Sequence, residues 1–341
     1  MFYSRVFKRE LTSSLQVLMV MALGSVLSST CTFLLLSPSL PERRFYEMKR
    51  SLARDRLHDQ HESFHKEESE QADKLAEQVR ILCLVTTMES NHEKKAAHLK
   101  NTWGRRCNKL IFMSTKDDPL LGAIDVDVPQ GKKYQWGKAK ASLKYVFDHH
   151  FHAFDWVFVA QEDTYAIIEN LRYMLSVYDP EDPLFFGSRI KSKAKQGSVS
   201  RNAGYVLSKS ALRKFVKEAM TDRIKCNADL EGSEEIEIGV CLENVGVKAG
   251  DSRDSLGRGR FFPCKPDSLV GGKIPQAYKD SAYYSPSVGL NCCSDMAISF
   301  YNIVGKRMYE YEYFFYHTRP YGIKHTFPVP AEMPFSAASH G

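Results

Sequence analysis

Strand-like and helix-like segments alternate through the first half of this chain, and this alternation limits the folds it can adopt. Apolar runs of strand length alternate with longer segments of helical spacing: the expected strands are residues 79–88, 109–115 and 155–160, and the expected helices are residues 93–107, 137–151 and 167–178. This order implies βαβ units with right-handed crossovers. The sequence therefore predicts an α/β fold with a mainly parallel sheet flanked by helices.

The second half of the chain is less regular. Residues 208–220 have helical spacing, and residues 250–295 are rich in Gly, Pro, Tyr and Ser, which predicts loops over one end of the sheet. Ligands of open α/β sheets bind at the carboxyl ends of the strands. We therefore expect functional residues where strands give way to polar loops.

An uncharged apolar segment, residues 15–36, lies near the N-terminus. About 22 helical residues are enough to cross a hydrocarbon core of about 30 Å. Arg5, Lys8 and Arg9 precede this segment, so the positive-inside rule places residues 1–14 in the cytosol. The pattern predicts a type II signal anchor. A cleaved signal peptide, whose apolar region spans about 7–15 residues, is the alternative.

Charged residues of both signs dominate residues 37–78, and aliphatic residues are few. Such a segment buries too little apolar area to offset its chain entropy, so we expect a solvated, partly helical stem. The folded lumenal domain is expected over residues 79–330, followed by a C-terminal tail, residues 331–341. The chain's net charge of +6 is spread without a basic-aromatic block, which argues against nucleic acid as a partner.

The chain has eight cysteines, of which only Cys31 lies in the apolar segment. A lumenal domain meets an oxidising compartment, so we expect disulfides among the other cysteines. Their number is odd, so at least one is unpaired or bonded to another molecule. Cys292 and Cys293 are expected to bond to different partners, because a ring between adjacent cysteines is strained. No spacing typical of a zinc site occurs.

Three polar residues, Gln161, Glu162 and Asp163, directly follow the strand expected at residues 155–160. A divalent cation held by carboxylate and imidazole groups can stabilise a leaving diphosphate. Asp163 is the first candidate ligand, and His317, expected to follow an aromatic strand, is its candidate partner. A solvated acid that caps the next helix and a structural histidine are the ordinary alternatives.

Glu234 and Glu235 stand where an acidic pair opens an apolar helix. A carboxylate can accept the proton of an attacking hydroxyl group, so either is a candidate general base. Acids in the first turn also stabilise a helix through its dipole, which is the alternative role.

Several sequence blocks, in one order, resemble the core 1 β1,3-galactosyltransferase (T-synthase) family over residues 80–325. The blocks are "HLKNTWGRRCNKLIFMS" (98–114), "QEDTYAIIENLRYMLSVYDPEDPLFFG" (161–187), "AGYVLSKSAL" (203–212), "VKAGDSRDSLG" (247–257), "CCSDMAISF" (292–300) and "MYEYEYFFYHTRPYG" (308–322). The resemblance implies a GT-A-like glycosyltransferase fold, UDP-galactose as donor, Mn²⁺ as cofactor and N-acetylgalactosamine α-linked to Ser or Thr as acceptor. It also implies an inverting transfer to O3 of that sugar, in a Golgi membrane protein with a lumenal catalytic domain.

The resemblance assigns roles to individual residues. Asp163 and His317 correspond to metal ligands, while Gln161 and Glu162 occupy the other positions of a run that is three aspartates in the family. The family's Glu-Asp pair corresponds to Glu234 and Glu235, so the presumed base is longer by one methylene. Such a shift of about 1 Å can cost about 10²-fold in rate. Arg201 and Asn202 replace two glycines and are expected to crowd the acceptor.

The acceptor is expected to contact polar loops beyond the carboxyl edge of the sheet, with Asp251, Arg253 and Asp295 as contacts. Tyr283 and Tyr284 are candidates for stacking on a sugar face, and ordinary surface aromatics are the alternative. Three further possibilities remain open for the whole chain: dimerisation through the stem, another donor or acceptor, and a non-catalytic role like that of Cosmc, the chaperone of T-synthase. Cosmc has lost the acidic run and the histidine that this chain keeps.

Overall fold

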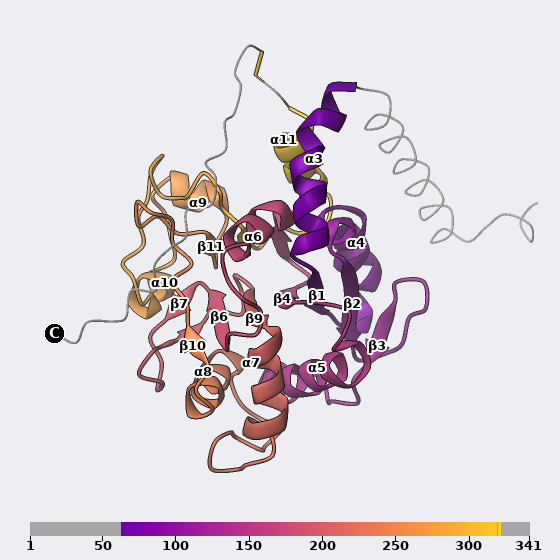
Figure 1. The fold of residues 1–341 in the computed structure, drawn as a ribbon, viewed down its shortest axis with the longest axis vertical. Helices are drawn as coiled ribbons and strands as arrows, with labels where there is room; N and C mark the ends of the chain where they lie inside the picture. The colour runs from indigo at the N-terminus through magenta and orange to yellow at the C-terminus, as the bar shows by residue number, and fades with distance from the viewer. Residues whose placement is uncertain (1–62, 319, 322–341) are drawn as a thin grey trace, which may run out of the picture. The chain divides into compact units, whose positions relative to one another are not determined.

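The computed structural model describes residues 63–318 and 320–321 (Figure 1). The chain divides into two units, residues 1–67 and 68–341, and the described elements belong almost entirely to the second. The predicted anchor, residues 15–36, lies outside the described residues. Within the described part, no helix is both long and apolar enough to cross a membrane. The last residues of the predicted stem form helix α3 (Ser63–Gln78).

A seven-stranded sheet with the order β10-β6-β9-β4-β1-β2-β3 forms the centre of the second unit (Figure 1). Its strands are β1 (Ile81–Thr86), β2 (Lys109–Ser114), β3 (Ala123–Asp125), β4 (Trp156–Gln161), β6 (Leu184–Gly187), β9 (Tyr205–Ser208) and β10 (Lys248–Ala249). All neighbouring strands are parallel except β9, which is antiparallel to β4 and β6. The predicted α/β fold and its three early strands are confirmed.

Side chains of β1 alternate between two hydrophobic cores, as expected for a strand covered on both faces. Cys83 and Val85 belong to the core that includes residues of α4 (Ala97–Asn101) and α6 (Ile168–Leu175). Leu82 and Leu84 belong to the other core, whose helices are α5 (Gln135–His150), α7 (Lys209–Lys214) and α8 (Glu234–Asn244). Helices therefore cover both faces of the sheet.

Shorter elements complete the unit. The helix expected over residues 93–107 is divided into a π-helical turn (His92–Ala96), α4 and a 3₁₀ turn (Trp103–Arg106), and another π-helical turn (Phe215–Ala219) extends α7. One small sheet contains β5 (Thr164–Ala166), β11 (Phe261–Phe262) and β12 (Ser299–Tyr301). Another pairs β7 (Arg189–Ile190) with β8 (Ser198–Val199). The region expected to be built from loops contains two short helices, α9 (Pro266–Val270) and α10 (Gln276–Ser281).

The aromatic segment before His317 is a helix, α11 (Arg307–Tyr316), so the strand expected there is wrong. Met308 and Glu312 are buried, and the Tyr316 hydroxyl group donates to Glu169 at 2.6 Å. These three side chains recur at every fourth position, which is a helical spacing. Many aromatic residues made the segment resemble a strand, but the positions that contact the protein follow the helical period.

Three disulfides join Cys83 to Cys107, Cys226 to Cys241, and Cys292 to Cys293, and Cys264 is a buried free thiol. The expected disulfides and the unpaired cysteine are confirmed. The expectation that Cys292 and Cys293 have different partners is wrong. Four of the remaining described cysteines bond to one another, and the adjacent pair lies in a turn before β12, where the two sulfurs meet across one peptide.

Candidate functional site

Four polar segments meet at one edge of the central sheet. Parallel β1, β4, β6 and β10 all end at this edge, and antiparallel β9 begins there. Thr86 of β1 pairs with Gln161 of β4, so the residues that follow these two strands are neighbours. The segment before β9 and the loop that starts at Asp251 reach the same edge. This is the position where open α/β sheets bind ligands.

Glu162 is buried at this edge, and its carboxylate is bonded within the protein. One oxygen accepts from the Thr87 hydroxyl group and the other accepts from the Asn91 amide. Lys95 Nζ lies 3.2 Å from Glu162 Oε1. Through these three donors, Glu162 joins the segment after β4 to the segment after β1.

Asp163 has a different environment. Its Oδ2 lies 3.6 Å from Lys95 Nζ, while its Oδ1 is buried and has no hydrogen-bond partner among the described residues. Burial lowers the pKa of Lys95, but the carboxylates of Asp163 and Glu162 outweigh it and raise that pKa overall. A buried carboxylate oxygen without a donor is uncommon and fits a cation or a hydroxyl group supplied by a ligand. The first residue of the run, Gln161, donates from its amide to Asn202 Oδ1 at 2.8 Å.

The acidic pair at the start of α8 faces the segment before β9. Glu234 is buried and accepts from the Tyr205 hydroxyl group at 3.0 Å and from Arg201 Nε at 3.1 Å. Glu235 Oε1 accepts from the Ser200 hydroxyl group and the Arg201 backbone N–H, at 2.8 and 2.9 Å. Burial raises the pKa of Glu234, although Arg201 acts against this shift. The predicted acidic helix start is confirmed, and both carboxylates are fixed by one segment.

Two further side chains at this edge were missed by the sequence reasoning. Lys138 of α5 donates from Nζ to the Thr87 carbonyl oxygen, and burial lowers its pKa to about 8. Tyr301 of β12 has a raised pKa, first because of burial and then because of the nearby Asp163 carboxylate. Neither residue carries a clear signal in the sequence, since Trp136 and Ala139, the buried residues near Lys138, are not on its own side of the helix.

Three of the predicted acceptor contacts lie together. The Arg253 guanidinium group lies 3.5 Å from the Tyr284 ring centroid and pairs with Asp251 at 2.7 Å. Arg189 donates to the Tyr284 hydroxyl group at 3.1 Å. Burial acts to raise the pKa of Asp251, but hydrogen bonds from Arg253 lower it overall. One face of Tyr284 is therefore already covered by a cation.

The remaining predicted residues have other neighbours. Asp295 pairs with Arg258 at 3.0 Å, and its side chain is 82% exposed. The Arg189 guanidinium carbon lies over the Tyr283 ring, 3.9 Å from the ring centroid. His317 follows α11 and stacks on the Tyr313 ring.

The sheet edge offers few side chains that could bind a metal ion. Within the described ranges, no group of three or more His, Cys, Asp or Glu side chains could hold a metal ion. The orphaned Oδ1 of Asp163 fits a single metal ligand, so a cation here needs most of its coordination from a substrate.

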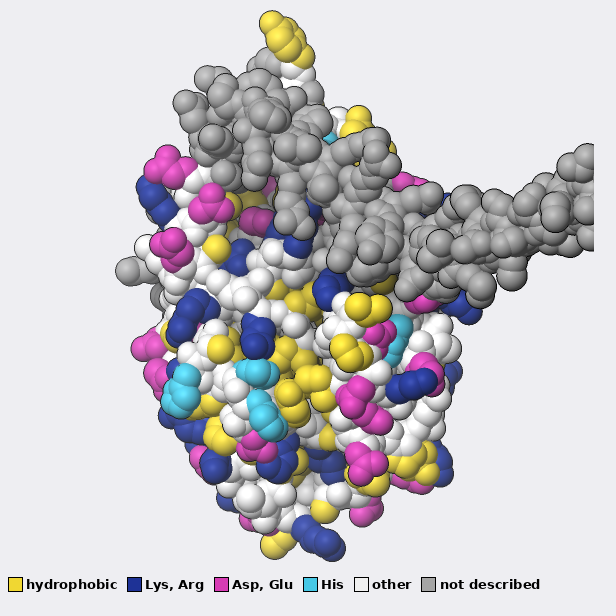
Figure 2. Space-filling view, turned by 90° about the vertical axis from the view of Figure 1, so that its right-hand side faces the viewer, with side chains coloured by type: hydrophobic (Ala, Val, Ile, Leu, Met, Phe, Trp, Pro, Cys, Tyr) yellow, Lys and Arg dark blue, Asp and Glu magenta, His cyan; other side chains and the backbone are white. Residues whose placement is uncertain are grey.

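Histidines also gather at the other end of α5, away from the candidate site. His149, His150 and His152 line a hollow of about 630 Å³ together with Phe147 and Phe151. Figure 2 shows histidine side chains beside hydrophobic ones on one face of the molecule. This hollow precedes β4, whereas the candidate site follows it.

Comparisons of the sequence with known proteins find related glycosyltransferases. The sequence pattern described as Fringe-like matches residues 76–254. Glycoprotein-N-acetylgalactosamine 3-beta-galactosyltransferase 1 of Xenopus laevis is 38% identical over 269 residues, which cover 77% of this chain and 74% of that protein. Beta-1,3-glucosyltransferase of Mus musculus is 25% identical over 170 residues, which cover 49% of this chain and 34% of that protein.

A solved glycosyltransferase involved in the glycosylation of the major capsid of PBCV-1 is 17% identical, with a TM-score of 0.26, over 39% of this chain and 62% of that chain. This similarity is too low to support an inference.

Proposed function

This chain belongs to the Fringe-like family, and from that premise we propose that it transfers galactose from UDP-galactose to O3 of N-acetylgalactosamine on Ser or Thr of glycoproteins. The observation that carries the proposal is one edge of the sheet. There Asp163 has a buried oxygen with no partner among the described residues, and Arg201 binds Glu234 and Glu235 beside the Gln161–Asn202 contact. The similarity to a galactosyltransferase supports the choice of donor and acceptor.

In the proposed reaction, the acceptor O3 attacks galactose C1, the C1–O bond to UDP breaks, and a carboxylate takes the O3 proton. Glu235 is the proposed base, with Glu234 beside it. Glu235 Oε1 is held by two donors, and no described residue donates to its other oxygen, which leaves a site for the proton. Ser200 and the Arg201 backbone thus orient the base.

Mn²⁺ is proposed to be held by Asp163 and His317, with the donor diphosphate as further ligand, and to stabilise charge on leaving UDP. Gln161 is proposed to contact the donor, and Glu162 is proposed to orient the donor site through the residues that its carboxylate holds. Asp251, Arg253, Tyr284 and Asp295 are proposed for the acceptor side, where the Arg253–Tyr284 stack offers a flat polar surface. We also propose that residues 15–36 anchor the chain in the Golgi membrane with residues 79–330 in the lumen, and that the stem supports a homodimer.

The test uses the full-length chain purified in detergent, with UDP-galactose, a peptide bearing N-acetylgalactosamine on Ser or Thr, and Mn²⁺. UDP release and a galactosylated peptide with a β1,3 linkage are expected, and UDP-glucose serves as the competing donor. Asp163→Asn should abolish most turnover. Asp148→Asn, which changes an acid of α5 paired with Lys144, should leave it unchanged.

Absence of turnover from the folded wild type would overturn the enzymatic proposal. Binding of a T-synthase polypeptide by the same preparation would then favour a chaperone role like that of Cosmc.

A further inference from the structure

Lys138 is a partly buried cation at the candidate site without a carboxylate bonded to it. Its Nζ donates to the Thr87 carbonyl oxygen, and among the described residues no ion pair joins it to an acid. Two other cations at this edge differ. Lys95 lies between Glu162 and Asp163, and Arg201 pairs with Glu234.

This arrangement is costly for an ammonium group. Burial removes water from Lys138 and lowers its pKa to about 8, although the Glu162, Asp125 and Glu234 carboxylates act against this shift. Lys138 also lies in the first turn of α5, the positive end of the helix dipole, where a cation is unfavourable. An anionic ligand at this position would remove the cost.

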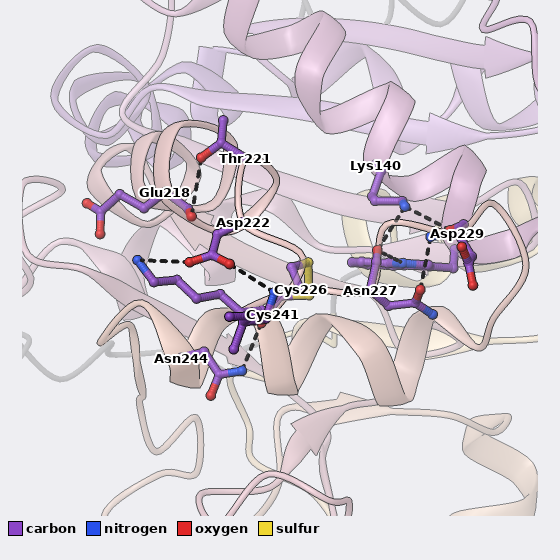
Figure 3. The surroundings of a disulfide bond; sticks show 12 residues. Lys140, Glu218, Thr221, Asp222, Cys226, Asn227, Asp229, Cys241 and Asn244 are labelled. Atoms are coloured by element: carbon purple, nitrogen blue, oxygen red, sulfur yellow. Dashed lines mark hydrogen bonds and ion pairs between the residues drawn. A yellow bond between two sulfur atoms is a disulfide. The ribbon is translucent and has the colours of Figure 1, made fainter.

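A second lysine on the same helix shows what a structural role looks like. Lys140 donates to the carbonyl oxygens of Asn227 and Asp229 at 2.9 and 2.8 Å (Figure 3). Its Nζ also lies over the Trp136 ring, 5.2 Å from the centroid. These contacts satisfy it within the loop after α7, beside the Cys226–Cys241 disulfide. Lys140 is therefore a matched control for Lys138.

The surroundings of Lys138 identify the place where the anion would lie. Thr87, whose carbonyl oxygen it contacts, donates its hydroxyl group to Glu162. The Glu162 carboxylate already has three donors, so it has no need of a further cation. The Glu162 carboxylate raises the pKa of Lys138, and the Arg201 guanidinium group on the segment before β9 lowers it. Its charge thus acts at the edge that holds Asp163.

We propose that Lys138 contacts the diphosphate of the nucleotide-sugar donor and supplies positive charge to the leaving group, so that the chain binds nucleoside diphosphate without a divalent metal. This inference rests on the proposed function and assigns it a further donor-binding residue. Gln161 strengthens the reasoning, because a neutral amide there attracts a divalent cation less than a carboxylate does.

The experiment is calorimetry on the full-length chain in detergent, with uridine, UMP and UDP as ligands, in EDTA and in Mn²⁺. In EDTA, the wild type should bind UDP more tightly than uridine. Lys138→Met should weaken metal-free UDP binding by about tenfold or more, the usual size of a charge-assisted contact, and leave uridine binding unchanged. Lys138→Gln keeps a donor for Thr87 without the charge and decides the case if the Met variant does not fold. Lys140→Met should bind UDP like the wild type.

Two results would overturn the inference while the proposed function stands: a wild type that binds UDP only with Mn²⁺, or Lys138 variants that weaken uridine and UDP equally. A wild type that binds no UDP even with Mn²⁺ would overturn both. The inference is supported if the Lys138 variants weaken UDP binding but not uridine binding, and if Lys140→Met binds UDP as tightly as the wild type.

Discussion

Loss of charge at the two neighbouring acids after β4 should affect two different properties of the protein. Glu162 accepts from Thr87 and Asn91 and pairs with Lys95. Among the described residues, Asp163 has one long ion pair, at 3.6 Å, and a buried oxygen without a hydrogen-bond partner. We therefore predict that Glu162→Gln mainly lowers stability, whereas Asp163→Asn mainly lowers Mn²⁺-dependent UDP binding.

The contacts set the magnitudes. A hydrogen bond to a charged group contributes about 1.5–3 kcal/mol, so Glu162→Gln should reduce the free energy of unfolding by about 2 kcal/mol or more. For a domain of this size, each kcal/mol shifts Tm by about 2–4 °C. Lys95 keeps its shorter contact with Glu162 after Asp163→Asn, so that change should cost less than about 1 kcal/mol. Loss of one ligand should weaken Mn²⁺-dependent UDP binding by about tenfold or more.

The two properties are measured separately. Urea denaturation and thermal melting of the ligand-free protein give stability, and calorimetry with UDP, with and without Mn²⁺, gives binding. If Asp163→Asn destabilises the protein as much as Glu162→Gln and leaves Mn²⁺-dependent UDP binding intact, Asp163 is a structural acid and the reasoning is wrong.

Three other perturbations test the structure independently. Arg106 pairs with Glu312 at 2.7 Å and with Glu169 at 3.2 Å, and its guanidinium group lies over the Tyr316 ring. Arg106→Leu should therefore lower the free energy of unfolding by about 3–5 kcal/mol in urea titrations. An unchanged urea midpoint would contradict the buried ion-pair network. The Cys226–Cys241 disulfide spans a sequence separation of 15, so replacing both cysteines by serine should lower the free energy of unfolding by about 3 kcal/mol in urea titrations. A smaller loss than for Lys140→Met would show that the disulfide is not the main constraint on this loop. Lys138 has a pKa of about 8 and is charged below that pH, so metal-free UDP binding should weaken as pH rises from about 7 to about 9 and should be flat for Lys138→Met.

The central strands could be predicted because burial on both faces leaves a continuous apolar run in the sequence. β1 and β4 are of this kind, and the structure pairs them in register from Ile81 with Trp156 to Thr86 with Gln161. The reversal of β9 could not be predicted, because its four residues have the same apolar pattern in either direction. Strand direction depends on how the preceding segment crosses the sheet edge, which is a tertiary property.

The acids of the candidate site were predictable from their position after a strand and at a helix start. Their partners were not. Lys95 and Lys138 lie on helical segments, where lysines are usually solvated, and only the meeting of four segments reveals that they share an edge. The pairing of Cys292 with Cys293 was mispredicted for a related reason, since general strain arguments do not say which other thiols are within reach.

The positions where this chain departs from the resembling galactosyltransferases are joined to one another. Gln161, which the resemblance places at a carboxylate position, donates to Asn202, which it places at a glycine position. The neighbouring Arg201, also at a glycine position by that resemblance, donates to Glu234 through its side chain and to Glu235 through its backbone. Unrelated losses in an inactive protein have no reason to lie in direct contact, whereas changes in a working site must fit one another. The contacts at Arg201 and Asn202 therefore fit the proposed catalytic site, in which the Arg201 backbone N–H would hold the Glu235 side chain in place.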